Sequence, residues 1–177
     1  MRCSCLIFIL TFNSALHSTH PIKMVKFTNL KCATLDKPFA DFANCKLKAL
    51  SRDEVALSLR VKLFAVPVNN VSLKLEFFKK FNGYRPFLFN RTLDFCAFLR
   101  NQKSVGFVHI IAKFVESSSN INHTCPYSHD IIIDGLILKP QYFSLLPLPA
   151  GEYRWKITFG TYNDWKGIVD VFVQFWE

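Results

Sequence analysis

The stretch Val55-Ala-Leu-Ser-Leu-Arg-Val-Lys-Leu63 decides the fold, together with Val71-Ser-Leu-Lys-Leu-Glu-Phe77 just downstream. In both segments every second residue is apolar and the residues between them are small or polar. This two-residue period is typical of a strand with one buried face and one wet face. Pro67 and Asn70 favour a turn between the segments. We therefore predict an antiparallel β-hairpin from these two strands.

The same period returns near the C-terminus. One predicted strand alternates through Tyr153 to Phe159 and another through Val169 to Phe175, and Asn163, Asp164 and Gly167 are expected to form the turn between them. Shorter strands are predicted at residues 25–32, 45–50, 84–89 and 130–134, with Asn82-Gly83 as a turn before the third of these. Several antiparallel strands separated by turns predict a mainly β protein, an immunoglobulin-like sandwich of two antiparallel sheets.

The middle of the chain changes period. Thr92 is expected to cap a helix that starts at Leu93. After a break near Ser104 and Gly106, the apolar residues recur at helical spacing, at Phe107, Ile110, Ile111 and Phe114. The sandwich is therefore predicted to contain a short helical insertion at about residues 92–117.

The N-terminus has the features of a secretory signal. Arg2 precedes an apolar run at residues 5–12, and small polar residues follow up to Ser18. This run is shorter than the roughly 20 residues needed to span a bilayer, but it suits a signal-peptide core. We predict a signal peptide at residues 1–18, a single domain at 19–177, no transmembrane segment, and secretion to the extracellular space. The alternative is a buried N-terminal strand.

Four cysteines remain after residue 18, namely Cys32, Cys45, Cys96 and Cys125. In an oxidising compartment an even set predicts disulfides, and four cysteines allow three pairings. Locality favours Cys32–Cys45 and Cys96–Cys125. The rival is a metal site in which His123 and His129 join Cys125, but the chain lacks the closely spaced ligand pairs that zinc prefers. We therefore expect no bound metal.

Three N-x-[ST] triplets are candidate glycosylation sites in a secreted chain, at Asn70, Asn90 and Asn122. Each is expected at a turn or at the end of an element, where an acceptor is exposed. We predict that at least one carries a glycan, with Asn70 as the first choice.

Composition, charge and the lack of catalytic motifs argue against a nucleic-acid-binding protein and against an enzyme. The chain is 50% hydrophobic and has 19 Phe, which suits one domain with a large core, and its net charge is +9. The lysines are scattered, so we interpret the charge as a solvated basic surface and expect no nucleic-acid partner. The chain has no nucleophile elbow, zinc-protease motif or phosphate loop. His109, Asp130 and Asp134 are interpreted as structural, so we expect neither an enzyme nor a cofactor.

Several motifs together resemble known families. Asp94-Phe-Cys96, Asn122-His-Thr-Cys-Pro-Tyr127 and Leu148-Pro-Ala-Gly-Glu-Tyr153, with Gly83-Tyr-Arg-Pro-Phe87 and the Cys32 and Cys45 contexts, are similar to a large insect family of secreted proteins of unknown function. The C-terminal half also resembles the ML lipid-recognition superfamily, in its ganglioside-activator branch. One departure is that no cysteine follows Cys125 to tether the last strand.

This resemblance implies a non-enzymatic protein that binds a lipid or other apolar small molecule between its sheets, in chemosensory, reproductive or defence signalling. The inward residues of the predicted strands would line the cavity, namely Leu57, Leu59, Val61, Leu73, Leu75, Phe77, Trp155, Ile157, Phe159, Val171, Val173 and Phe175. The alternative is that these residues fill a close-packed core. The protein would then be an extracellular interaction module, a ligand or co-receptor for a cell-surface receptor.

Overall fold

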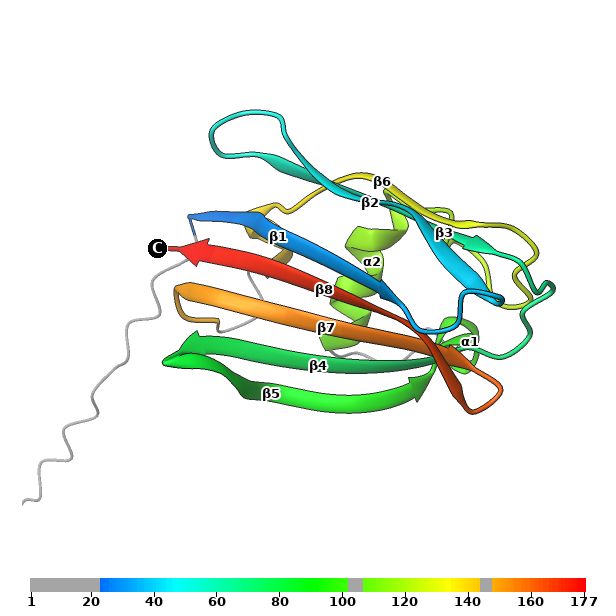
Figure 1. Ribbon diagram of the computed structural model, residues 1–177. Coiled ribbons are helices and arrows are strands. Elements are labelled where there is room, and N and C mark those ends of the chain that lie inside the picture. The colour runs from blue at the N-terminus through cyan, green and yellow to red at the C-terminus, as the bar shows by residue number, and fades with distance from the viewer. Residues whose placement is uncertain (1–22, 102–106, 144–147) are drawn as a thin grey trace, which may run out of the picture.

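The computed structural model describes residues 23–101, 107–143 and 148–177, which form two antiparallel β-sheets with helices beside them (Figure 1). The predicted two-sheet antiparallel sandwich with short helices is confirmed. The predicted signal peptide at residues 1–18 lies outside the described residues. Of the helices that the structure describes, none is long and apolar enough to cross a membrane.

The larger sheet has five strands whose inner face is apolar. Across this sheet the order is β1 (Met24–Thr34), β8 (Asp164–Trp176), β7 (Gly151–Thr161), β4 (Ser72–Phe81) and β5 (Gly83–Asp94). The register places Phe77 opposite Trp155 and Trp155 opposite Val171, so that inward residues of three strands form continuous rows. The predicted closing strands are thus confirmed, and both are longer than expected.

The smaller sheet has three strands in the order β2 (Ala40–Ala49), β3 (Val55–Leu63) and β6 (Ile131–Ile137). A disulfide joins Cys32 of β1 to Cys45 of β2. Because β1 and β2 belong to different sheets, this bond ties the two layers together. It is one of the two pairs that locality favours.

The predicted hairpin between residues 55–63 and 71–77 is wrong. Both segments are strands, but β3 pairs with β2 and β6, whereas β4 pairs with β5 and β7. Residues 64–71 cross from one sheet to the other. Alternation shows only that a strand has a buried face, and two strands that face each other across a core satisfy it as well as two neighbours do.

The helical insertion is α1 (Phe95–Arg100) and α2 (Phe107–Glu116). The expected start at Leu93 is wrong, because β5 continues to Asp94 and Thr92 pairs with Lys74 in the sheet. The true cap is Asp94, whose carboxylate accepts a hydrogen bond from the amide of Ala97 at 2.9 Å. The predicted break at Ser104 and Gly106 lies outside the described residues.

The turn predicted around Asn163, Asp164 and Gly167 is shorter than expected. Tyr162 and Asn163 both have positive φ and make the whole turn, and β8 already begins at Asp164. Gly167 lies inside the strand, where it allows close packing and does not form the turn.

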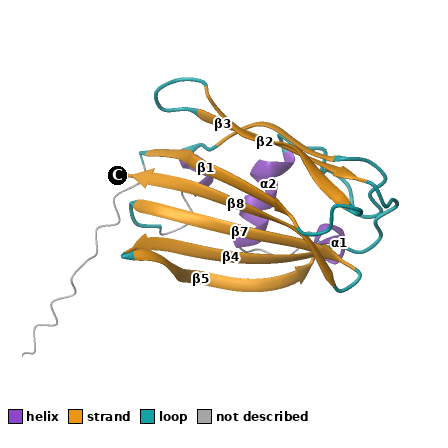
Figure 2. Ribbon diagram, viewed as in Figure 1, coloured by secondary structure: helices purple, strands orange, loops and turns teal. Residues whose placement is uncertain are grey.

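Helix α2 and the three-stranded sheet both pack against the larger sheet (Figure 2). The small sheet contacts β1 through β2 and β3. Helix α2 packs farther along, where the ring of Phe114 lies 6.4 Å from Trp155 of β7 and 5.9 Å from Phe143 of the 3-10 helix η1 (Pro140–Phe143). The larger sheet therefore forms one side of the interior, and the smaller sheet and α2 form the other.

Candidate ligand cavity

A cavity of about 360 Å³ lies between the sheets and is lined mainly by apolar side chains. Ligand pockets in proteins typically measure about 300–1,000 Å³ and have apolar walls with few polar groups. The interior of this sandwich is therefore not completely filled by its own side chains.

The structure places ten of the twelve predicted lining residues on the cavity wall. They come from β3 on one side and from β4, β7 and β8 on the other, namely Leu57, Leu59, Val61, Leu73, Leu75, Trp155, Ile157, Phe159, Val171 and Val173. These strands contribute to both sheets, so the wall needs the two layers to face each other.

Phe77 and Phe175 are corrections to the predicted lining. Both are almost fully buried, at 1% and 0% exposure, in an aromatic cluster beside the cavity. Phe77 stacks on Tyr153 at 5.2 Å, and Phe175 meets Phe143 edge-on at 4.9 Å. Large rings on neighbouring strands fill the interior there, so this part of the sandwich is a packed core.

Helical residues also line the cavity, although none of the predicted lining residues lies in a helix. The structure adds side chains from α1, α2 and β6, among them Phe95, Phe98, Val108, Ile111, Ala112, Val115, Ile131 and Ile133. The apolar face of α2 was visible in the sequence. Its position over β4 and β7 was not, because it depends on tertiary packing.

The segment before β6 forms one part of the wall and is fixed by a disulfide between Cys96 of α1 and Cys125, the second pair that locality favours. Tyr127 is buried and donates a hydrogen bond to the carbonyl of His123 at 2.5 Å, and burial raises the pKa of Tyr127 to about 12. The Nε2 atoms of His123 and His129 lie 2.9 Å apart. Cys125 is bonded to another cysteine, and no group of three or more metal-ligating side chains occurs among residues 23–101, 107–143 and 148–177.

Another part of the wall carries a buried cation. Lys166 of β8 is 9% exposed, and its ammonium lies 2.6 Å from a carboxylate oxygen of Asp36 and 2.8 Å from one of Asp164. Two hydrogen bonds raise the pKa of Lys166, and the bond to Asp164 has a larger effect than the bond to Asp36. The amine therefore stays protonated. Thr161 is also on this wall, and its hydroxyl donates to the carbonyl of Asn70.

The other candidate polar residues cross-link the fold. Asp130 pairs with Arg60 at 2.7 Å, and Asp134 accepts a hydrogen bond from Ser58 at 2.8 Å. The Ser58–Asp134 bond joins β3 to β6, and the Arg60–Asp130 pair joins β3 to the residue just before β6. His109 of α2 lies on the wall with its ring 6.5 Å from that of Phe98.

The three candidate glycosylation residues are exposed. Asn70 and Asn122 lie in loops, as expected. Asn90 lies inside β5, so its expected place at a turn or element end is wrong. As β5 is the edge strand of the larger sheet, its exposed residues still face solvent.

Comparison with known proteins gives two similarities. Residues 73–155 match the model of a family described as "Protein of unknown function (DUF1091)", which confirms the resemblance to an uncharacterised family. The solved structure of a Niemann-Pick type C2 protein from the Japanese carpenter ant is similar at 14% identity, covering 87% of this chain and 93% of that chain, with a TM-score of 0.30. The chain matches none of the curated proteins.

Proposed function

We propose that this protein is a secreted, non-enzymatic carrier that binds a lipid or other apolar small molecule in the cavity between its sheets. The observation that carries the proposal is the cavity of about 360 Å³ with a mainly apolar wall. An apolar ligand would gain about 0.8 kcal/mol for each methylene group that it moves from water into such a wall.

The chemistry of the wall supports binding over catalysis. Thr161, Thr124 and Tyr127 donate their hydroxyl hydrogens to backbone carbonyls, so these groups stabilise the fold. The two disulfides suit an oxidising compartment outside the cytosol. The alternative function is an interaction module that acts as a ligand or co-receptor through its surface. This alternative assumes a close-packed interior, and the cavity argues against such an interior.

A binding assay with a designed cavity variant tests this function. The neutral fluorescent probe N-phenyl-1-naphthylamine should bind the protein saturably, and methyl palmitate or cholesterol should displace it. Ala112 of α2 lies on the wall, so Ala112→Phe should fill the cavity with its ring. We expect probe affinity to fall at least about tenfold, a loss of about 1.4 kcal/mol in binding.

Ala49→Phe is the matched control, because it adds the same ring at an exposed position of β2. Its probe affinity should equal that of the unsubstituted protein. Thermal melting of both variants separates loss of binding from loss of fold. Absence of saturable binding, or equal affinity in the Ala112→Phe variant, would reject the carrier function.

A further inference from the structure

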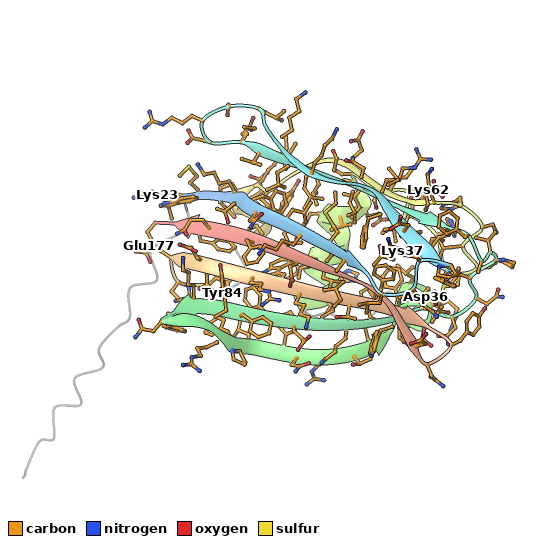
Figure 3. All side chains as sticks on the ribbon, viewed as in Figure 1. Lys23, Asp36, Lys37, Lys62, Tyr84 and Glu177 are labelled. Carbon is orange, nitrogen blue, oxygen red and sulfur yellow. A yellow bond between two sulfur atoms is a disulfide. The ribbon has the colours of Figure 1, made fainter. Side chains whose placement is uncertain are left out.

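We propose that Asp36, Lys166 and Asp164 form a selectivity cluster that keeps anionic amphiphiles out of the cavity, so that its ligand is a neutral apolar molecule. The inference rests on the proposed carrier function and adds the chemical class of the ligand. Asp36, labelled in Figure 3, lies in the β1–β2 connection. Its partner Lys166 and the third member, Asp164, are among the first residues of β8.

Lys166 is the buried cation of the wall and the obvious partner for an acidic head group. Its ammonium already contacts two carboxylates and lies 5.1 Å from the ring centre of Phe39. The side chain of Lys166 is 10% exposed, whereas those of Asp36 and Asp164 are 28% and 67% exposed. The cation is therefore enclosed by its own counter-charges, which leave the cluster with an excess of negative charge.

The pKa shifts of Lys166 and Asp164 favour the ionised form of this pair at neutral pH. The hydrogen bond from Lys166 lowers the pKa of Asp164, and the same bond raises the pKa of Lys166. Of the three cluster residues only Lys166 lines the cavity, and its ammonium is already paired with the carboxylates of Asp36 and Asp164. An incoming carboxylate would have to displace an aspartate before it could pair with Lys166.

The remaining polar groups of the wall cannot replace the hydrogen bonds and charge pairing that an acidic head group loses when it leaves water. His123 places one ring nitrogen 2.6 Å from the carbonyl of Thr124 and the other against His129. Lys113 and Glu116 are exposed residues of α2 and carry opposite charges one turn apart. An ionised head group that left water for this cavity would lose its hydration without an equivalent partner, which is strongly unfavourable. A neutral ester or hydrocarbon avoids this cost.

The test compares two ligands that share one acyl chain. Palmitate and methyl palmitate are titrated at pH 8 against the N-phenyl-1-naphthylamine complex of the protein. We expect methyl palmitate to displace the probe at a concentration at least about tenfold lower, equivalent to about 1.4 kcal/mol. The variant Asp36→Asn with Asp164→Asn frees Lys166, so its palmitate affinity should rise about tenfold while its methyl palmitate affinity stays unchanged.

A charge-matched control is Asp53→Asn with Glu54→Gln, which removes two exposed carboxylates between β2 and β3. It should keep the preference of the unsubstituted protein. Asp164→Asn alone, at a largely exposed side chain, should shift the preference in the same direction if the double variant folds poorly.

The outcomes distinguish the two proposals. Equal or tighter binding of palmitate by the unsubstituted protein would overturn the selectivity and leave the carrier function intact. An unchanged preference in every folded cluster variant would also overturn it. If neither ligand nor the probe binds, the carrier function fails, and the selectivity fails with it.

Discussion

At the scale of single residues, Gly167 sets how closely β8 approaches its neighbours. A Cβ atom on this residue would lie 2.5 Å from the Phe159 ring and 3.3 Å from the carbonyl oxygen of Ala33. Atoms of β7 and of β1 therefore both lie close to the Cα atom of Gly167. The side chain of Phe159 also lines the cavity, so this packing shapes the ligand wall.

We predict that Gly167→Ala lowers the free energy of unfolding by about 1–3 kcal/mol, as overpacking of a fitted interior does. Adding Phe159→Leu should recover part of this loss, because it shortens the ring that the new methyl group meets. Urea denaturation of the two single variants and the double variant measures the coupling. Strictly additive effects would contradict this explanation.

Tyr127 should make stability depend on alkaline pH. Burial raises its pKa to about 12 from the ordinary value of 10.0, so the folded chain holds this proton more tightly than the unfolded chain does. Between these pH values the unfolded chain binds fewer protons, and the free energy of unfolding falls as the pH rises. Full stabilisation is present below about pH 10.

The expected result is that Tyr127→Phe loses less stability than the unsubstituted protein when the pH is raised from 9 to 11. Urea denaturation at both pH values measures the difference. Tyr162 is exposed, so Tyr162→Phe should keep the slope of the unsubstituted protein. Identical slopes for all three proteins would show that Tyr127 does not contribute.

At the scale of elements, alternation identified the strands but not their partners. The apolar faces of β3 and β4 both point into the interior, and this made them look like a hairpin although they belong to opposite sheets. Turns were predicted at Asn82-Gly83 and near Asn163, and the structure has tight β4–β5 and β7–β8 connections at these places. A short connection restricts pairing far more than a long one does.

The start of α1 gives a test with a built-in control. Asp94 caps the helix through the amide of Ala97, whereas Thr92 lies in β5. Asp94→Ala should lower the free energy of unfolding by about 1 kcal/mol, the usual effect of losing an N-cap side chain. Thr92→Ala should cost less than half as much, as measured by urea denaturation. A larger loss of stability in Thr92→Ala than in Asp94→Ala would show that Thr92 is the N-cap.

At the scale of the whole molecule, the exposed asparagines remain candidate glycosylation sites. Asn70 lies in the loop that crosses between the sheets, Asn90 on the edge strand, and Asn122 beside the cavity. When the protein is expressed through a eukaryotic secretory pathway, an amidase that removes N-glycans should increase its gel mobility. The triple Asn→Gln variant should migrate like the treated protein, and an enzyme treatment without any shift would exclude glycans at all three sites.

The sequence by itself determined the features that depend on neighbouring residues. The two-residue period located the strands and the inward side chains, ten of which lie on the cavity wall. Short separation along the chain favoured the two cysteine pairs that the structure contains. These features are local, because side-chain direction along a strand and closure of a short loop need no knowledge of the rest of the fold.

Only the tertiary structure decided how these parts combine. It placed β3 and β4 in different sheets, set α2 over β7, and filled one region with the rings of Phe77 and Phe175 while leaving a cavity beside them. It also brought Asp36 to Lys166, which is 130 residues away in the chain. Such contacts depend on which distant segments share one interior and on how their volumes fit, and alternation carries information about neither.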